Sequence, residues 1–361
     1  NYRGDLIAAV TETLNDIEGS YALGVVCTDC PQQFVAARKD SPLIVGLGKG
    51  ENFIASDIPA LLAYTREVYI LEDREVVRVS SESVEIFNLL GERVEHEIFH
   101  VDWDVAAAEK GGFEHFMIKE ISEEPHAMQQ TLWPRLQGGE VVLENSEALL
   151  AAVADCHRIN IVACGTAYHA GVVGKYLIEK LVRVPVEVDV ASEFRYRDPL
   201  VEPGQLTIII SQSGETLDTL MAMREAKRKG SRTLAVVNVV GSSIAREADD
   251  VLYTWAGPEI AVASTKAYNT QLAALYLLTL AFARAKGLLD TASYLAYQEE
   301  LRLLPDRVAE VLAQKDAIQK FAAAHFNAKS VFFIGRGLDY ALALEASLKL
   351  KEIAYIHSEA Y

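Results

Sequence analysis

The sequence predicts an α/β protein in which a parallel sheet, wound on both sides by helices, follows a segment of mostly antiparallel strands. Short strands separated by turn residues fill the segment before residue 101. From residue 145 onward, strand, loop and helix alternate, as they do when helices cover a parallel sheet. A glycine-containing strand end recurs one domain length later, at Gly165 and at Gly335, and this indicates the start of a second copy of the same unit.

The front segment is predicted to hold one amphipathic helix, at residues 6–17, and then strands. A glycine-rich connector is expected at 101–112, and a helix at about 113–132 opens the rear of the chain. These elements divide the chain into a first domain at 1–105, a linker with a connecting helix at 106–144, an α/β domain at 145–290 and a truncated second copy at 291–361. The β-branched or aromatic strands expected in front are 21–27, 33–37, 43–46, 53–56, 67–71, 75–79 and 84–88.

The rear strands are nearly continuous apolar runs, of which 206–210 is the clearest, and such runs suit burial on both faces of a parallel sheet. The resemblance of 159–166 to 331–337 places one clear strand and its following helix in the second copy, which is too little to close a sheet. The expected strands are 158–164, 184–190, 205–210, 232–237 and 250–255, and the expected helices are 168–181, 216–229 and 266–286.

Charge and composition exclude several classes of function. The net charge is −17, and residues 1–147 hold 27 acidic and 11 basic residues whereas the rest hold 24 and 23. The acidic front disfavours nucleic acid and membrane surfaces, while the nearly neutral rear can accept a small anion. No apolar run is long enough to cross a bilayer. We interpret the lone C-x-x-C at Cys27 and Cys30 as an ordinary turn, and we expect a cytoplasmic protein with no metal and no cofactor.

The sharpest local motif follows the strand at 205–210 and opens a helix. A helix start presents unpaired N–H groups and a partial positive charge, and Gly214 lets the backbone approach a ligand closely. The alternative is a simple capped helix with Ser213 as its N-cap. The residues of this motif are Ser211, Gln212, Ser213, Gly214, Glu215 and Thr216.

Two further loops fall at the same edge of the predicted sheet, because the carboxyl ends of parallel strands meet there. Thr166 follows the first strand, and Ser264 precedes the helix at 266–286. Their hydroxyls suit sugar oxygens, although helix caps are the alternative.

A third feature is Lys349 and Glu352, which stand three apart in the last predicted helix and therefore share one face. On one face, a carboxylate can move a proton while an ammonium stabilises the charge that develops. A surface ion pair is the alternative.

These motifs, in this order, closely resemble those of the glutamine:fructose-6-phosphate amidotransferases, also called glucosamine-6-phosphate synthases. The resemblance spans nearly the whole chain and implies one sugar isomerase (SIS) domain, the start of a second, and in front the last part of an N-terminal-nucleophile glutaminase α+β domain. The segments that carry it are 19–22, 46–57, 191–197, 211–216, 262–266 and 349–361.

The resemblance implies a homodimeric enzyme that passes ammonia from glutamine to fructose 6-phosphate and forms glucosamine 6-phosphate. It implies that Glu352 moves the proton between C1 and C2 and that Lys349 assists it. It implies sugar contacts from Thr166 and Ser264. It further implies that the phosphate is held by Ser211, Gln212, Ser213 and Thr216.

The sequence departs from the family in two loops, since Ala167 and Val240 stand where the family usually has serine and proline. The resemblance also places the family's nucleophilic cysteine before Asn1 and its ring-opening histidine and terminal lysine after Tyr361. We therefore expect an inactive fragment that lacks both ends, releases no ammonia from glutamine and has no complete isomerase site. Glutamine would be bound only by the complete protein. Two alternatives stay open: a non-catalytic sugar-phosphate sensor, and a deglycase built from the same domains.

Overall fold

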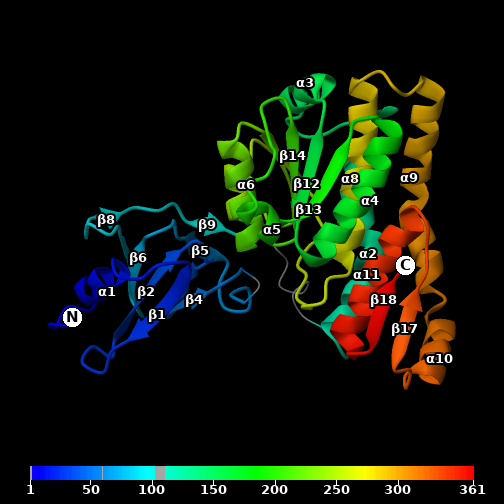
Figure 1. Cartoon of the computed structure of the whole chain (residues 1–361). Helices are drawn as coiled ribbons and strands as arrows, with labels where there is room; N and C mark the ends of the chain where they lie inside the picture. Colours follow the sequence, from blue (N-terminus) through cyan, green and yellow to red (C-terminus); the bar gives the residue numbers. More distant parts are fainter. Residues whose placement is uncertain (1, 59, 102–109) are drawn as a thin grey trace. The chain divides into compact units, whose positions relative to one another are not determined.

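The computed structural model describes residues 2–58, 60–101 and 110–361, which fall into two compact units that divide between Gly111 and Gly112 (Figure 1). Most of the predicted connector at 101–112 lies outside the described residues.

The first unit contains helix α1 (Leu6–Leu14) and two antiparallel sheets, which confirms the antiparallel strands predicted for this segment. The Asp5 side chain caps α1 by accepting a hydrogen bond of 3.2 Å from the Ala8 amide. The sheet orders are β1-β2-β6-β7-β8 and β4-β3-β5-β9. The strands are β1 (Tyr21–Val26), β2 (Gln33–Lys39), β3 (Ile44–Leu47), β4 (Asn52–Ala55), β5 (Glu67–Ile70), β6 (Val76–Ser80), β7 (Val84–Phe87), β8 (Arg93–Val94) and β9 (Phe99–His100).

The second unit is built around a five-stranded parallel sheet of order β13-β12-β14-β15-β16, which confirms the predicted α/β fold. Its strands are β12 (Ile159–Ala163), β13 (Val186–Val190), β14 (Leu206–Ser211), β15 (Arg232–Val237) and β16 (Asp250–Tyr253). The helices between and after them are α4 (Gly165–Leu181), α5 (Ala191–Tyr196), α6 (Leu217–Arg228), α7 (Ser243–Glu247) and α8 (Lys266–Ala285).

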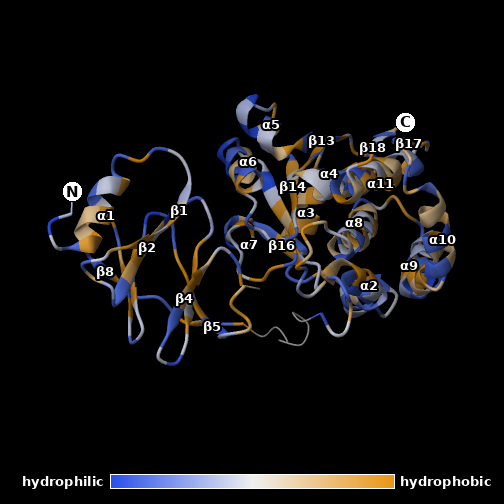
Figure 2. Cartoon of the chain, turned by 90° about the horizontal axis from the view of Figure 1, so that it is seen from below, coloured by the Kyte–Doolittle hydropathy of each residue, from blue (hydrophilic) through white to orange (hydrophobic). Residues whose placement is uncertain are grey.

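Helices cover both faces of this sheet because alternate residues of each strand point to opposite sides. Ile161 and Ile208 pack with α4 and α8 on one face, whereas Val162 and Ile209 pack with α5 and α6 on the other. Figure 2 shows the central strands as largely hydrophobic, as burial on both faces requires.

Further helices extend the α8 face, where α2 packs against α8 and α9. These elements are α2 (Phe116–Leu132), the 3₁₀ turn η2 (Trp133–Arg135), the short strands β10 (Leu136–Gln137) and β11 (Glu140–Val141), α3 (Glu147–Asp155) and α9 (Thr291–Leu312). The helix predicted at about 113–132 is thus present, while α3 and α9 were not predicted.

The chain ends with α10 (Lys315–His325), β17 (Ser330–Phe333), α11 (Leu338–Ala354) and β18 (His357–Ala360). The strand and helix predicted for the second copy correspond to β17 and α11. The structure adds β18, which pairs in parallel with β17. Within the described part of the chain, no helix is long and apolar enough to span a membrane.

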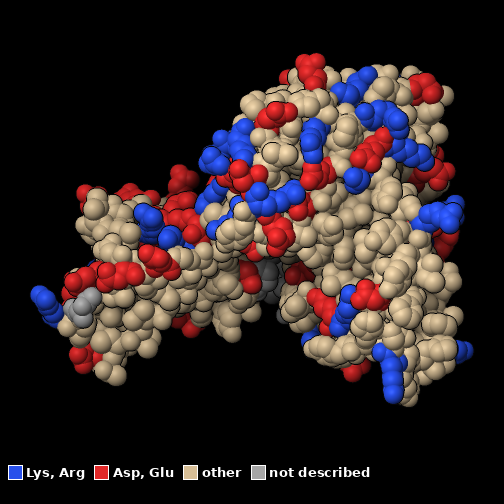
Figure 3. Space-filling view, in the orientation of Figure 1, with Lys and Arg blue, Asp and Glu red and all other residues tan. Residues whose placement is uncertain are grey.

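Charge differs between the units as the sequence predicts. On the face shown in Figure 3, acidic side chains gather over the first unit, whereas both signs are mixed over the second.

Candidate functional site

The order of the parallel strands determines where a ligand can bind. The connection from β12 through α4 leads to β13 on one side, and the later connection through α6 leads from β14 to β15 on the other. The neighbouring strands β12 and β14 therefore lie at a topological switch point, where open α/β sheets form a crevice at the carboxyl ends of the strands. A cavity of about 360 Å³ lies there, lined by the residues that follow both strands.

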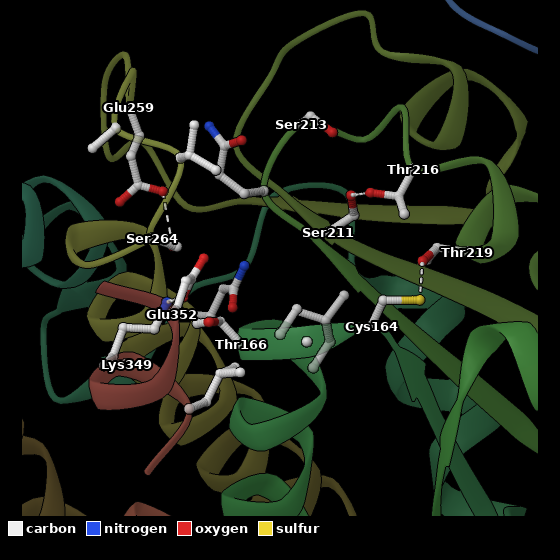
Figure 4. A pocket seen from close by; sticks show the side chains of 18 residues that line it. Cys164, Thr166, Ser211, Ser213, Thr216, Thr219, Glu259, Ser264, Lys349 and Glu352 are labelled. Atoms are coloured by element: carbon white, nitrogen blue, oxygen red, sulfur yellow. Dashed lines mark hydrogen bonds and ion pairs between the residues drawn. The ribbon is translucent and has the colours of Figure 1, made fainter. Parts of the chain in front are cut away.

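All eight predicted site residues line this one cavity. Figure 4 shows the Ser211, Ser213 and Thr216 hydroxyls on one side and the Lys349 and Glu352 side chains on the other. The eight residues come from four separate segments of the chain, and they are Thr166, Ser211, Gln212, Ser213, Thr216, Ser264, Lys349 and Glu352. Their individual roles stay predictions.

The loop from β14 to α6 (residues 211–216) is held by its own hydroxyl groups. The Ser211 Oγ accepts a hydrogen bond of 3.0 Å from the Gly214 amide and lies 3.1 Å from the Thr216 Oγ1. Gly214 has φ +66°, and a Cβ at this position would lie 2.0 Å from the Ser242 Oγ. The backbone therefore passes through a space that only glycine fits.

The N-cap residue of α6 is Thr216, not Ser213, so the simple capping interpretation of Ser213 is wrong. The Ser213 Oγ instead accepts a hydrogen bond of 3.1 Å from the Glu215 amide. The Thr216 side chain makes no capping hydrogen bond, so the first turn of α6 keeps donors for a ligand.

The Glu215 carboxylate is turned away from the helix start that would bind an anion. It accepts hydrogen bonds of 2.8 Å from both the amide and the hydroxyl of Ser243, at the start of α7. This arrangement leaves the β14–α6 loop with hydroxyl and amide groups, which is the chemistry that a phosphate ester requires.

The loop from β16 to α8 (residues 254–265) forms another wall and is organised by Glu259. Its carboxylate accepts hydrogen bonds from the Ser264 hydroxyl at 2.8 Å and from the Thr265 and Ala267 amides at 2.9 and 3.0 Å. Glu259 therefore caps α8 and fixes Ser264 at the cavity.

Helix α2 supports the same loop from outside the sheet. The buried Glu120 Oε1 accepts hydrogen bonds of 2.7 and 3.1 Å from the Ile260 and Ala261 amides. The buried Lys266 ammonium lies 2.8 Å from the Glu123 carboxylate. Burial raises the pKa of Glu120, and burial together with the Glu259 charge raises the pKa of Glu124 to about 7.

Lys349 and Glu352 form the predicted pair, with a separation of 2.7 Å between Nζ and Oε2. The pair is not an ordinary surface ion pair, because both side chains line the cavity and Lys349 is only 19% exposed. The Lys349 ammonium also lies 3.6 Å from the Glu345 carboxylate.

Glu345 connects α11 to the start of α4. Its buried carboxylate accepts a hydrogen bond of 2.9 Å from the Thr166 hydroxyl and lies 2.7 Å from the His169 Nδ1. Sequence reasoning missed Glu345, although it stands four residues before Lys349 and therefore on the same helical face. Sequence reasoning also missed Glu120 and Glu259, for which no local signal exists.

The strand order, the cavity and its hydroxyl-lined loop define a sugar isomerase (SIS) domain protein, and residues 152–281 and 326–361 match the SIS domain family. A curated aminotransferase from Caldanaerobacter subterraneus is 61% identical over 100% of this chain and 59% of its own length. One from Clostridium tetani is 56% identical over the same shares. Both are glutamine–fructose-6-phosphate aminotransferases (isomerizing).

A solved structure agrees with these relatives. The C-terminal domain of glucosamine-fructose-6-phosphate aminotransferase from Francisella tularensis is 44% identical, has a TM-score of 0.68, and is matched over 70% of this chain and 71% of that one. The chain belongs to the glutamine–fructose-6-phosphate aminotransferase (isomerizing) family. It spans 59% of the length of the curated relatives given above.

Proposed function

We propose that this chain binds fructose 6-phosphate and glucosamine 6-phosphate in the cavity between β12, β14 and α11. In the complete protein it would serve the transfer of glutamine-derived ammonia to fructose 6-phosphate and the isomerisation to glucosamine 6-phosphate. The observation that carries this proposal is that all eight predicted residues, from four separate segments, line one cavity.

The phosphate would bind at the β14–α6 loop. Ser211, Ser213 and Thr216 offer hydroxyls and Gln212 offers an amide, while the start of α6 adds backbone N–H groups and a partial positive charge. Thr166 and Ser264 would contact the sugar. Their hydroxyls are held by the Glu345 and Glu259 carboxylates, so each is oriented before a ligand arrives.

The isomerisation would be carried out on the α11 side of the cavity. Moving a proton between C1 and C2 of a ketose requires a base next to both carbons and a cation near the oxygen where negative charge develops. Glu352 would move the proton, and Lys349, which lies 2.7 Å from it, would stabilise the charge.

The cellular location of the protein, its assembly and the partners that it does not bind are also proposals. We infer that the chain binds neither nucleic acid nor membrane, because the acidic first unit repels polyanions. The cytoplasmic location and the homodimer are inferred from the family alone. The sensor and deglycase alternatives are not favoured, since the relatives with 51–61% identity are all named glutamine–fructose-6-phosphate aminotransferases.

Calorimetric titration with the two sugar phosphates tests this proposal. We expect millimolar or tighter binding by the unaltered chain, and a loss of at least roughly tenfold, about 1.4 kcal/mol, in the double variant Ser213→Ala, Thr216→Ala. A matched variant, Thr28→Ala with Ser81→Ala, removes two exposed hydroxyls of the first unit and should bind normally. Equal affinity in the first variant and in the unaltered chain would remove the β14–α6 loop from the proposal.

A further inference from the structure

Gln271 is a buried polar residue of the cavity wall that makes no hydrogen bond to the rest of the described chain. It lies in α8, lines the cavity and is 3% exposed, and its Oε1 is fully buried without a partner. Buried side-chain amides in proteins are nearly always hydrogen-bonded, because burying one without a partner costs free energy. The side-chain amide of Gln271 therefore gains a partner for Oε1 only when a group in the cavity bonds to the amide and turns Oε1 toward the cavity.

The missing partners are concentrated on one face of α8. Thr265 Oγ1 and Tyr268 Oη are also buried without a partner, and with Gln271 they recur every three residues, which places them on neighbouring turns of the same face. Other buried hydroxyls of the helix are satisfied, since Thr270 and Thr279 donate to backbone carbonyls at 3.0 and 2.7 Å. Of the three unpaired groups, only Gln271 lines the cavity, so it is the one that a ligand there could satisfy.

The chemistry of an amide indicates which part of a ligand it would meet. A glutamine side chain is neutral and offers two N–H donors and one acceptor, so it pairs with groups that both donate and accept, such as sugar hydroxyls. A phosphate has only acceptors at its oxygens when doubly charged, and the β14–α6 loop already offers donors for it. Gln271 belongs to a different wall, the one that carries Ser264.

We propose that Gln271 is a sugar-binding residue that recognises hydroxyl groups of the hexose and so contributes to the choice of substrate. The inference rests on the proposed function, because it requires a hexose phosphate in this cavity. It makes a distinctive prediction: removing the amide should weaken binding of the sugar without weakening binding of phosphate, and without destabilising the fold.

Replacing Gln271 by leucine tests this inference in the full chain. Titrations followed by phosphorus NMR would give the affinities for fructose 6-phosphate and for inorganic phosphate. We expect the affinity for fructose 6-phosphate to fall at least roughly tenfold, because a hydroxyl would be buried without its partner, while the affinity for inorganic phosphate changes less than about twofold. The melting temperature should stay the same or rise, since an unsatisfied buried group is removed.

Gln298 provides a matched control. It is as buried as Gln271, at 4% exposure, but its Nε2 donates a hydrogen bond of 2.9 Å to the Gly139 carbonyl, and it does not line the cavity. Gln298→Leu should therefore give the opposite result, a lower melting temperature with unchanged affinity for both ligands.

The outcomes separate the two proposals. If the unaltered chain binds no sugar phosphate, the proposed function and this inference both fail. If it binds fructose 6-phosphate and Gln271→Leu binds it equally well, only the role of Gln271 is overturned. The same holds if the variant loses both ligands to the same degree or melts several degrees lower, because either result would indicate a structural role.

Discussion

The two loops that face each other across the cavity are built in different ways. The β14–α6 loop is held by bonds among its own residues, such as the one from the Gly214 amide to the Ser211 hydroxyl. The β16–α8 loop depends on α2, because the Ile260 and Ala261 amides bond to Glu120, about 140 positions earlier in the chain. The segment after β15 also holds the first loop, since the Asn238 and Ile244 amides donate to the Gln212 and Gly214 carbonyls, and Glu259 holds the second loop from within. The first loop therefore uses contacts from nearby parts of the chain, whereas the second also depends on a distant helix.

The loops also differ in charge. The carboxylate of the β14–α6 loop, Glu215, is turned toward Ser243, so the loop presents neutral donors. The β16–α8 loop instead contains the carboxylate of Glu259 and lies beside those of Glu120 and Glu124, whose pKa values are raised. The first wall thus offers donors suited to an anion, while the second contains carboxyl groups whose charged forms are disfavoured by burial.

Gly214→Ala should have the largest effect, because it disrupts the β14–α6 loop itself. The new Cβ would lie 2.0 Å from the Ser242 Oγ, and the backbone at φ +66° disfavours any side chain. We expect about 3–5 kcal/mol of lost stability and no measurable binding of fructose 6-phosphate, as followed by urea unfolding and calorimetry. Adding Ser242→Gly removes the clash and should recover much of the stability. No recovery would mean that the backbone angle alone sets the cost.

This contrast explains how much of the molecule the sequence predicts. The parallel strands and the β14–α6 loop were predicted because their signals are local: an apolar run, then hydroxyls, a glycine and a helix start. The Lys349 and Glu352 pair was predicted with the help of family resemblance, since spacing alone equally fits a surface ion pair.

The parts that were not predicted depend on distant contacts. The roles of Glu120 and Glu345 appear only when α2 packs beside the β16–α8 loop and α11 packs beside α4. The local pattern also allows Ser213 as the N-cap, whereas the N-cap in the structure is Thr216, after a loop in which Ser211 Oγ bonds to Gly214 and lies 3.1 Å from the Thr216 hydroxyl. Helix α9 carries Pro305 within it, which weakens the local signal for a continuous helix.

The second prediction concerns how stability depends on pH, which tests whether the β16–α8 wall lies beside a carboxyl group with a raised pKa. Burial raises the pKa of Glu124 from 4.5 to about 7, so between these values the folded state binds more protons than the unfolded state. The stability from this group is present below pH 4.5 and is lost as the pH rises through about 7. Glu124→Gln should remove that slope and be more stable than the unaltered chain at pH 8, by up to about 3 kcal/mol.

Urea unfolding at several pH values would measure this slope. Glu147→Gln, which changes an exposed carboxylate at the start of α3, is the control and should keep the slope of the unaltered chain. If the free energy of unfolding changed with pH in the same way for the unaltered chain and for Glu124→Gln, the pKa of Glu124 would not be raised by burial.

The third and smallest effect is expected for Glu120→Ala, which changes the support of only one of the two loops. Glu120→Ala leaves the Ile260 and Ala261 amides without their acceptor, which should cost about 1–2 kcal/mol of stability. Because only the β16–α8 loop is loosened, the affinity for fructose 6-phosphate should fall by roughly threefold to tenfold while that for inorganic phosphate stays unchanged.

Glu120→Gln decides whether the charge or the acceptor matters. Glutamine keeps an oxygen for the two amides and removes a buried carboxylate whose second oxygen has no partner, so this variant should bind normally and be at least as stable. Gln130→Ala, an exposed change on the same helix, serves as the control. If Glu120→Ala weakened binding of both ligands equally, the two walls would not be independent, because a change confined to the supports of the β16–α8 loop would then also have altered the β14–α6 loop.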